Sequence, residues 1–295
     1  MNLLITGGTG FIGKHLVKEL SSNHQLHLLV RPNTGSTIPK GVKTIVFDDN
    51  IAELHQYILE NEIEGVFHLA TLFVAQHQAE QIKNMLLSNI YLGTAVLEAT
   101  QHTAVKWVIN TGTYWQHFHS EDEIYCPTSL YAASKQAFID MAAYYTQVDD
   151  IKFVTLKLSD SFGDGDTRPK LFTVLKEAIV SGKQLQMSPG EQVLDILHVK
   201  DIVSGFVHLM KLLNENKALG SDYILAAKQR FTLREVVAIF EKVSGKKINV
   251  VWGGRPYRDR EIMQPWNKGI MLPEWEAKLS LEEGINLYLS KTEQR

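Results

Sequence analysis

A tyrosine and a lysine four residues apart offer the chemistry of proton transfer to an oxygen. Tyr131 and Lys135 stand in Tyr131-Ala-Ala-Ser-Lys135, inside a stretch that predicts a helix over about residues 129–147. Residues at i and i+4 lie on one face of a helix, so the phenol and the ammonium are neighbours. A phenol with a pKa of about 10 is a poor acid at neutral pH, and an adjacent cation lowers that pKa. The pair therefore predicts a tyrosine that exchanges a proton with a hydroxyl or carbonyl group.

A second chemical signal is a glycine-rich turn close to the start of the chain, Thr6-Gly-Gly-Thr-Gly-Phe-Ile-Gly13, with the spacing G-x-x-G-x-x-G. In a dinucleotide site one glycine permits the tight turn, one lets the backbone approach the diphosphate, and the third lets the helix pack close to the strand. The free N–H groups of the helix start then face the phosphates. An ordinary turn is the alternative, but the strand–turn–helix context favours a dinucleotide site. Its expected contacts are Gly7, Thr9, Gly10, Phe11, Ile12 and Gly13.

The end of the second predicted strand bears on which dinucleotide is bound, because a carboxylate there would accept from the adenosine ribose. This strand runs into Val30-Arg31-Pro32 without an acid. Arg31 is suited to pair with a 2′-phosphate, so we expect NADP(H), with NAD(H) left open and a solvated arginine as the other interpretation. The remaining expected contacts are Asp48 at the adenine and, after the fourth strand, Leu69, Ala70 and Thr71.

Hydroxyl groups follow the fifth predicted strand, in Asn110-Thr-Gly-Thr-Tyr-Trp115. Ligands of parallel sheets lie outside the carboxyl ends of the strands. A hydroxyl there can bond the reacting oxygen as it gains charge. We expect Thr111 to take this role, with Thr113 as the second candidate. Tyr-x-x-x-Lys alone is common on helix surfaces, but the glycine turn, the hydroxyl and the Tyr–Lys pair occur in this order and together predict a redox site.

Alternating apolar and amphipathic segments predict how the chain positions these groups. Strands are expected at about 2–6, 26–30, 43–47, 65–69, 106–111 and 153–158, and helices at about 11–22, 51–60, 79–101 and 129–147. Such alternation indicates a parallel sheet with helices on both faces. We therefore expect an α/β fold whose residues 1–163 form a doubly wound Rossmann sheet, with a return of segments near 192–213.

After Gly163 the segments become shorter, which predicts a smaller C-terminal α/β lobe over residues 164–295. Capping boxes at 232–235 and 280–283 predict the starts of two helices. The other expected elements are a helix from Arg168-Pro169 to about Gly182, a strand at 193–199, a helix at about 200–213, a short strand at 223–226 and an ordered loop at 252–273.

Composition excludes several classes of protein. The 295 residues are 44% hydrophobic and 21% charged, which permits a sizeable core and excludes a disordered or fibrous chain. A net charge of -3 provides no basic field for nucleic acid. No apolar run approaches the roughly 18 residues that span a membrane, and no leader pattern precedes the first predicted strand. Cys126 is the single cysteine, so we expect no internal disulfide and a cytoplasmic protein.

The motifs resemble those of the short-chain dehydrogenase/reductases, in particular their extended, nucleotide-sugar-modifying branch. The glycine turn matches that branch in full. Further similar segments span essentially the whole chain: His68-Leu-Ala70, Asn89-Ile-Tyr-Leu-Gly-Thr94, Leu156-Lys-Leu-Ser-Asp-Ser-Phe-Gly163 and Leu194-Asp-Ile-Leu-His-Val199. The resemblance implies a catalytic set of Thr111, Tyr131 and Lys135. It also implies a nucleotide-diphosphate sugar as substrate and a homodimer that pairs through two long helices.

Within this branch, the sequence is most similar to reductases that form CDP- or dTDP-linked deoxysugars such as abequose or fucose. That similarity implies NADPH-dependent reduction of the C4 ketone of a nucleotide-linked 4-keto-6-deoxyhexose, with Tyr131 as proton donor. Dehydratases of the branch follow the catalytic Thr with Asp-Glu, where this chain has Gly112-Thr113. An epimerase that retains tightly bound NAD is the alternative. A non-catalytic NADP-sensing regulator is disfavoured by the Tyr–Lys pair.

The second lobe is expected to hold the nucleotide diphosphate. Arginines clamp phosphates and a tyrosine can stack on a base or ribose, which points to Arg255, Tyr257 and Arg258, although a solvated basic loop also fits. Asp160 replaces the family's Asn, and a carboxylate beside a diphosphate is unfavourable, so we expect it to bond a sugar hydroxyl. Thr113, Tyr114 and Trp115 are expected to face the sugar, with a core position as the alternative for the two aromatic residues.

Other polar clusters do not point to a metal. His117 and His119 lack a nearby third ligand. Asp164 and Asp166 lie in a glycine loop and fit a turn better than a Ca²⁺ site. Cys126 precedes a proline without a clear base partner and is expected to be structural. We therefore expect no metal site.

Overall fold

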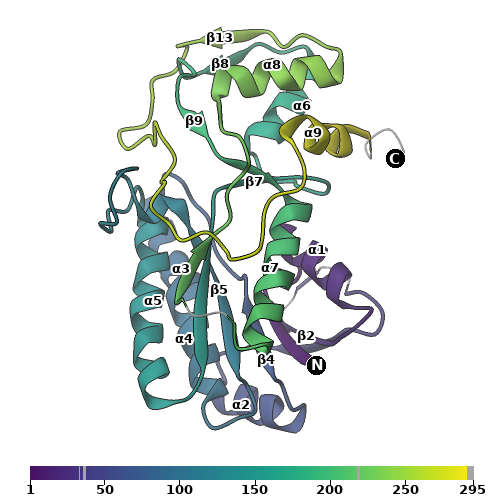
Figure 1. The fold of residues 1–295 in the computed structure, drawn as a ribbon, viewed down its shortest axis with the longest axis vertical. Coiled ribbons are helices and arrows are strands. Elements are labelled where there is room, and N and C mark those ends of the chain that lie inside the picture. Colours follow the sequence, from purple (N-terminus) through teal and green to yellow (C-terminus); the bar gives the residue numbers. More distant parts are fainter. Residues whose placement is uncertain (33, 36–37, 218–219, 291–295) are drawn as a thin grey trace.

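The computed structural model describes residues 1–32, 34–35, 38–217 and 220–290. Its centre is a seven-stranded sheet in the order β11-β6-β5-β4-β1-β2-β3 (Figure 1), and each pairing in it is parallel. The strands are β1 (Asn2–Thr6), β2 (Gln25–Val30), β3 (Lys43–Val46), β4 (Gly65–His68), β5 (Trp107–Thr113), β6 (Lys152–Leu158) and β11 (Asp222–Ile224). The predicted α/β fold with a doubly wound parallel sheet is confirmed.

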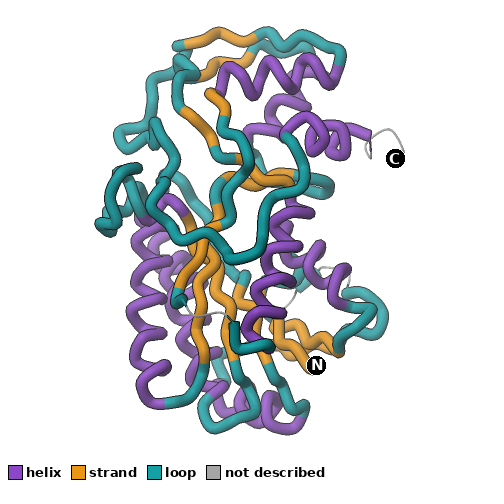
Figure 2. Tube along the Cα trace, in the orientation of Figure 1, coloured by secondary structure: helices purple, strands orange, loops and turns teal. Residues whose placement is uncertain are grey.

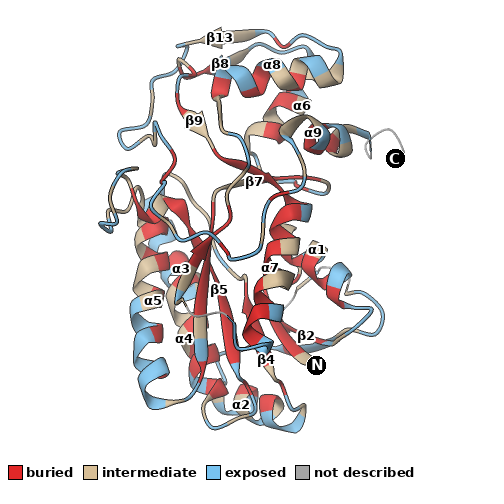
Figure 3. Ribbon diagram, in the orientation of Figure 1, coloured by how far each residue is buried: buried red, intermediate tan, exposed pale blue. Residues whose placement is uncertain are grey.

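Helices cover both faces of the sheet, as crossovers between parallel strands require. On one face lie α1 (Phe11–Leu20) and α7 (Val199–Asn214). The other face carries α2 (Ile51–Glu60), α4 (Leu92–Thr100) and α5 (Leu130–Val148) (Figure 2). Every residue of β4 and β5 is buried (Figure 3), so these strands have no polar outer face. Among the described residues, no helix is both long and apolar enough to cross a lipid bilayer.

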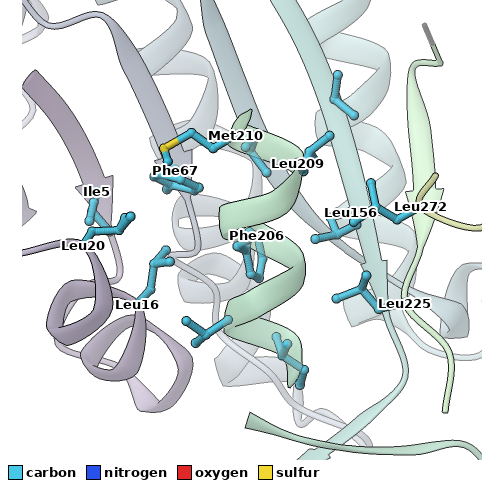
Figure 4. Packing of buried hydrophobic residues seen from close by; sticks show 14 of the residues in the cluster. Ile5, Leu16, Leu20, Phe67, Leu156, Phe206, Leu209, Met210, Leu225 and Leu272 are labelled. Atoms are coloured by element: carbon cyan, nitrogen blue, oxygen red, sulfur yellow. The ribbon is translucent and has the colours of Figure 1, made fainter. Parts of the chain in front are cut away.

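An apolar layer fixes α7 against the sheet. Figure 4 shows Phe206 and Leu209 of α7 in this layer together with Phe67 of β4 and Leu156 of β6. The rings of Phe67 and Phe206 meet edge to face with their centroids 6.2 Å apart. Each fully buried side chain of this size contributes roughly 1.5–3 kcal/mol. This packing therefore stabilises the position of α7 on the sheet.

One predicted helix is interrupted. In place of a single helix over 79–101, the chain forms a 3-10 turn at Ala79–Gln81, α3 (Ile82–Leu86), a π-helical turn at Leu87–Tyr91, and α4. A π-helical turn adds a residue to the helix and is frequent at functional sites. Here it carries Asn89, whose side chain is completely buried.

The remaining elements form the smaller lobe, drawn above the sheet in Figure 1. Three strand pairs, β7 with β10, β8 with β13 and β9 with β12, join three helices around a separate apolar core. The strands are β7 (Asp160–Phe162), β8 (Leu185–Met187), β9 (Val193–Leu194), β10 (Ile196–His198), β12 (Phe231–Thr232) and β13 (Val250–Trp252), and the helices are α6 (Leu171–Ser181), α8 (Leu233–Ser244) and α9 (Leu281–Ser290).

Both predicted capping boxes are confirmed. The hydroxyl of Thr232 accepts from the N–H of Glu235 at 3.2 Å, and the Glu235 carboxylate accepts from the N–H of Thr232 at 2.7 Å. Ser280 and Glu283 form the same reciprocal pair. These starts of α8 and α9 are predictable because every bond in them is local.

Other boundaries in the lobe differ from the prediction. The strand expected over 193–199 is divided at Asp195, because β9 pairs with β12 whereas β10 pairs with β7. The helix expected to begin at Arg168-Pro169 begins at Leu171. Its start is delayed because the guanidinium of Arg168 bonds the carboxylate of Asp166 at 2.7 Å and shapes the preceding turn.

After the first part of the lobe the chain returns to the central sheet with two elements, α7 and β11, whereas only the first return was predicted. The return of α7 agrees with the predicted segment near 192–213. The short strand expected at 223–226 is β11, and it pairs with β6 in the central sheet, outside the lobe. The division of the chain at residue 163 remains a prediction.

Candidate active site

The glycine turn joins β1 to α1 at the carboxyl edge of the sheet. Gly7 has a left-handed φ of 68°, and a Cβ there would lie 2.6 Å from the backbone nitrogen of Ala70. A Cβ on Gly13 would collide with the carbonyl oxygen of Gly7, so α1 packs directly on the turn. Gly10 precedes α1, and no described side chain caps this helix. The first N–H groups of α1 are therefore available to an anion.

The predicted catalytic pair lies near the start of α5. The hydroxyl of Ser129 caps this helix by accepting from the N–H of Ala132 at 3.3 Å. Tyr131 is 7% exposed and Lys135 is completely buried. The Nζ of Lys135 has no hydrogen-bond partner among the described residues. A buried ammonium without a partner is costly, which indicates a position that a ligand completes.

Burial dominates the electrostatics of this pair. It raises the pKa of Tyr131 to about 12, against smaller opposite effects of the Thr71 hydroxyl and the Arg168 guanidinium. It lowers the pKa of Lys135 to about 8. The expected lowering of the Tyr131 pKa is not found, because burial outweighs the Thr71 hydroxyl and the Arg168 guanidinium. The phenol is protonated at neutral pH, and it can give up its proton only to an oxygen that gains negative charge.

The residues around the turn fit a dinucleotide. The open start of α1 offers N–H groups to a diphosphate, and a ribose hydroxyl would give the Lys135 ammonium the acceptor that the described chain does not provide. The other residues predicted for this cofactor surround the turn: Thr9, Phe11, Ile12, Leu69 and Ala70 are half-buried, and Thr71 is exposed.

The two residues expected at the adenosine end are accessible. Arg31 follows β2, Asp48 follows the neighbouring β3, and both side chains are exposed at the carboxyl edge. The hydroxyl of Thr34 donates to the carbonyl of Arg31 at 2.7 Å and shapes the turn after β2. No acidic residue occurs in the sequence between Val30 and Asp48.

A buried amide that was given no role in the sequence analysis organises the site. Asn89 Oδ1 accepts from the Leu72 N–H at 2.7 Å and from the Thr71 hydroxyl at 3.1 Å. Its Nδ2 donates to the Leu72 carbonyl at 3.1 Å and to the Ser134 hydroxyl at 2.9 Å. Ser134 in turn donates to the carbonyl of Tyr131 at 2.7 Å. The amide thus fixes the loop after β4 against the catalytic helix, and the motif that contains Asn89 is the sequence signal for it.

The hydroxyl residues of β5 have different partners. Thr111 is buried and donates to the carbonyl of His68 at 3.2 Å, at the ends of β4 and β5. The hydroxyl of Thr113 accepts from the N–H of Trp115 at 3.3 Å and so holds the turn that follows. Between them, a Cβ on Gly112 would lie 2.6 Å from Cγ2 of Thr155. Position 112 therefore has no room for an acidic side chain.

A cavity of about 680 Å³ lies between the carboxyl edge of the sheet and the lobe. Its lining includes aromatic side chains as well as hydroxyl and carboxylate groups. Its cations are Lys170, Arg255, Arg258 and Arg260. Four of the predicted substrate residues line it, namely Tyr114, Asp160, Arg255 and Arg258.

Some of the predicted substrate residues have partners in the protein. The hydroxyl of Tyr114 donates to the backbone after β11 at 2.8 Å, and its side chain is buried. Tyr257 does not line the cavity, because its hydroxyl accepts from the N–H of Glu191 at 3.0 Å and holds the ring elsewhere. Asp160 lies 3.8 Å from the Nζ of Lys170, which offsets the negative charge that Asp160 brings to the cavity.

Phe73 connects the catalytic tyrosine to this cavity. Its ring meets Tyr131 edge to face at a centroid distance of 5.0 Å and packs against Trp115 at 5.3 Å. The Nζ of Lys170 lies 4.7 Å from the Phe73 ring, and the guanidinium of Arg258 lies 5.7 Å from the Trp115 ring. Tyr131 is therefore in contact with a residue of the cavity lining, although it does not line the cavity itself. The sequence gives no signal for Phe73, because it belongs to an irregular loop.

The polar residues set aside in the sequence have contacts within the protein. His117 stacks on Trp266 with a centroid distance of 3.8 Å, and Cys126 Sγ accepts from the guanidinium of Arg260 at 3.0 Å. Asp166 bonds Arg168. Within the described part of the chain, no three His, Cys, Asp or Glu side chains are grouped so that they could hold a metal ion.

An open glycine turn, a buried Tyr–Lys pair and an adjoining cavity are the features expected of the resembled enzymes. Residues 3–226 match the profile of the NAD dependent epimerase/dehydratase family. The chain belongs to this family. Similar members include CDP-abequose synthase of Salmonella muenchen, 26% identical over 99% of this chain and 98% of that protein. CDP-abequose synthase of Yersinia pseudotuberculosis is 25% identical over 99% of this chain and 100% of its own length.

Solved structures share the fold of this family member. UDP-glucose 4-epimerase of Thermotoga maritima, crystallised with UDP-glucose, has a TM-score of 0.85 at 19% identity and covers 100% of this chain and 99% of its own. UDP-glucuronic acid 4-epimerase of Bacillus cereus, in complex with UDP-glucuronic acid and NAD, has a TM-score of 0.86 at 20% identity with the same coverage. The arrangement of sheet and lobe is thus shared with these two structures.

Proposed function

We propose that this family member reduces the C4 ketone of a nucleotide-linked 4-keto-6-deoxyhexose with NADPH. The observation that carries the proposal is the buried phenol of Tyr131, which packs against Phe73 of the cavity lining and lies one helical turn from the ammonium of Lys135, for which the described residues provide no partner. The similarity to CDP-abequose synthases over nearly the whole chain supports a nucleotide sugar as substrate. Arg31, with no acid before Asp48, supports NADPH over NADH.

The chemistry follows from the protonation states of the pair. Bound NADPH would supply the hydride that C4 receives. Tyr131, whose phenol is protonated at neutral pH, would donate its proton to the ketone oxygen as charge develops there. For the hydroxyl of Thr111 to donate to the same oxygen, it would have to rotate away from the His68 carbonyl, to which it donates at 3.2 Å. Lys135 holds the nicotinamide ribose and places a positive charge one helical turn from Tyr131, which stabilises the phenolate left after transfer.

The cationic side of the cavity suits the substrate diphosphate. Arg255 and Arg258 come from the predicted motif, and Lys170 and Arg260 add charges that the sequence analysis did not assign. Guanidinium groups bind phosphate oxygens in bidentate fashion. Asp160, paired with Lys170, is placed to bond a sugar hydroxyl.

Reduction is favoured over elimination by Gly112. Elimination of water needs an acid and a base beside the catalytic threonine. The enclosed position of Gly112 leaves no space for one of them, and Thr113 occupies the position of the other. An epimerase with tightly bound NAD is the second candidate, favoured by the shared fold with UDP-sugar 4-epimerases.

The test is oxidation of NADPH by the purified protein with 4-keto sugars linked to CDP, dTDP, GDP and UDP, with NADH assayed in parallel. We expect turnover with NADPH and at least one ketone. Retention of NAD through dialysis, together with interconversion of an ordinary nucleotide hexose and no net oxidation of NADPH, would instead establish the epimerase.

We also propose a homodimer that pairs through α3 and α5. Exposed apolar side chains lie on these helices and on the π-helical turn, namely Leu86, Leu87, Met141 and Tyr144. Light scattering after size exclusion is expected to give twice the chain mass, and Leu87→Lys with Tyr144→Lys is expected to give the monomer.

A further inference from the structure

A hydrogen-bonded serine and aspartate lie on the wall of the cavity, outside the catalytic set. Ser159 follows the last residue of β6, and Asp195 lies in the break between β9 and β10. Both line the cavity. The hydroxyl of Ser159 donates to Asp195 Oδ1 at 3.0 Å.

The direction of this hydrogen bond is fixed by the other partners of Asp195. Its Oδ1 also accepts from the N–H of Ala227 at 3.0 Å, and its Oδ2 accepts from Nε of Arg230 at 2.9 Å. The Asp195 side chain is 1% exposed. A carboxylate that is buried and ion-paired in this way is an acceptor, so the proton in the bond belongs to Ser159.

A serine hydroxyl has one proton and two acceptor lone pairs. Because Asp195 takes the proton, Ser159 presents lone pairs to the cavity and is an acceptor there. It would therefore bind a hydroxyl or ammonium donor of a ligand, whereas a ligand carbonyl or phosphate oxygen would be repelled.

Ser159 is also close to the position where the reaction would occur. In the parallel pair of β5 and β6, Thr113 lies opposite Leu158, so Ser159 emerges at the same edge as the end of β5. The cavity that Ser159 lines also contains Trp115 and Phe73, and Phe73 touches Tyr131. A sugar whose C4 reaches Tyr131 therefore has its ring hydroxyls on this side of the cavity.

We propose that Ser159 is a specificity-determining residue that accepts a hydrogen bond from a ring hydroxyl, at C2 or C3, of the sugar. The proposal rests on the proposed function for the identity of the ligand. Asp195 and Arg230 orient the serine. A site of this kind disfavours an analogue that lacks the hydroxyl, because the half-buried acceptor, enclosed by the bound sugar, is then left unpaired.

The test compares wild type and Ser159→Ala with three nucleotide sugars: the parent compound, its 2-deoxy analogue and its 3-deoxy analogue. Steady-state kinetics give kcat/KM for the 4-keto forms. Calorimetry gives Kd for the corresponding 4-hydroxy forms. For the parent and for one analogue, we expect Ser159→Ala to lower kcat/KM and to raise Kd, each about ten-fold. For the other analogue, which lacks the contacted hydroxyl, both changes are expected to be less than two-fold.

The matched control is Ser204→Ala, which removes a serine hydroxyl of α7 that does not line the cavity. It is expected to leave all ratios unchanged. An equal loss for all three sugars in Ser159→Ala, or no loss for any, would overturn the role of Ser159. If wild type reduces no ketone, the proposed function fails, and the Kd comparison still decides the role of Ser159.

Discussion

The side-chain amide of Asn89 donates to the hydroxyl of Ser134 at 2.9 Å, and this contact joins the π-helical turn to the catalytic helix. Ser134 lies between Tyr131 and Lys135 in sequence and bonds the carbonyl of Tyr131. The position of the phenol therefore depends on a residue in another helical segment, which has no contact with the proposed substrate cavity.

Replacing that amide should disturb both stability and rate. In Asn89→Ala the buried N–H and carbonyl of Leu72 lose their partner, which is expected to cost about 1–3 kcal/mol and to lower kcat at least ten-fold as Tyr131 loses its support. Denaturant unfolding and steady-state kinetics provide the measurements. Asn61→Ala, at a partly exposed amide in the same half of the protein, is the control. Equal kcat values for Asn89→Ala and wild type would show that the amide does not position the phenol.

Tyr131→Phe removes the proton donor and leaves the ring packed against Phe73. General acid catalysis is worth roughly a hundred- to ten-thousand-fold, so kcat is expected to fall by that factor while the Kd of the cofactor changes little. Stopped-flow NADPH oxidation and a fluorescence titration measure the two quantities. Tyr145→Phe, on the same helix but bonded to Glu98, is the control. A variant that turns over at the normal rate would remove Tyr131 from the mechanism.

Lys135→Met should make the protein without cofactor more stable. Burial lowers the pKa of Lys135 from 10.5 to about 8. The unfolded chain therefore binds this proton more tightly, and the charged lysine costs the folded state ~2–3 kcal/mol at pH 7. Methionine removes that cost, so the melting temperature is expected to rise while activity is lost. The difference should shrink between pH 8 and pH 10.5, where the folded wild type has already released the proton. A less stable variant at pH 7 would contradict this account.

The same titration predicts a pH dependence of cofactor binding. Below the pKa of about 8 the ammonium of Lys135 is charged and can bind a ribose hydroxyl, and above it the charge is lost. The affinity for NADPH is therefore expected to decline as the pH rises through about 8. In Lys135→Arg the guanidinium stays charged, so its affinity should show no such decline even if it is lower throughout. Fluorescence titrations between pH 6 and pH 10 would test this, and a decline shared by both proteins would assign it to another group.

Two glycine variants test the packing of the turn. In Gly13→Ala the new methyl group collides with the carbonyl of Gly7, so the start of α1 must move and both NADPH binding and stability are expected to fall sharply. Gly35→Ala is the matched control, because among the described residues, its chain neighbours apart, no atom lies within 4 Å of the added Cβ. Thermal unfolding with and without NADPH is the measurement. Unchanged binding in Gly13→Ala would mean that the close contact is not required.

The sequence allows prediction of the features that depend on local or repetitive patterns. Continuous apolar runs predict the buried strands β1 and β4, and the reciprocal bonds of Thr232 with Glu235 and Ser280 with Glu283 define two helix starts. The spacing of Tyr131 and Lys135 likewise predicts that they are neighbours, because residues four positions apart lie one turn apart on the same face of a helix.

What the sequence does not predict depends on contacts between distant segments. Strands β8 and β13 have three residues each and are stabilised by pairing with one another across the lobe. The pKa of Tyr131 depends on how deeply α5 is buried, which no local pattern records. Phe73 and Ser159 line the cavity only because the tertiary structure brings the sheet and the lobe together around it.

The incorporation of β11 into the central sheet has a consequence for protein engineering. After α7 the chain enters the sheet at Asp222–Ile224 and then goes back to build α8, β13 and α9. No single cut can therefore release the lobe as an independent fragment, and transplanting substrate preference between relatives requires the exchange of several discontinuous segments at once.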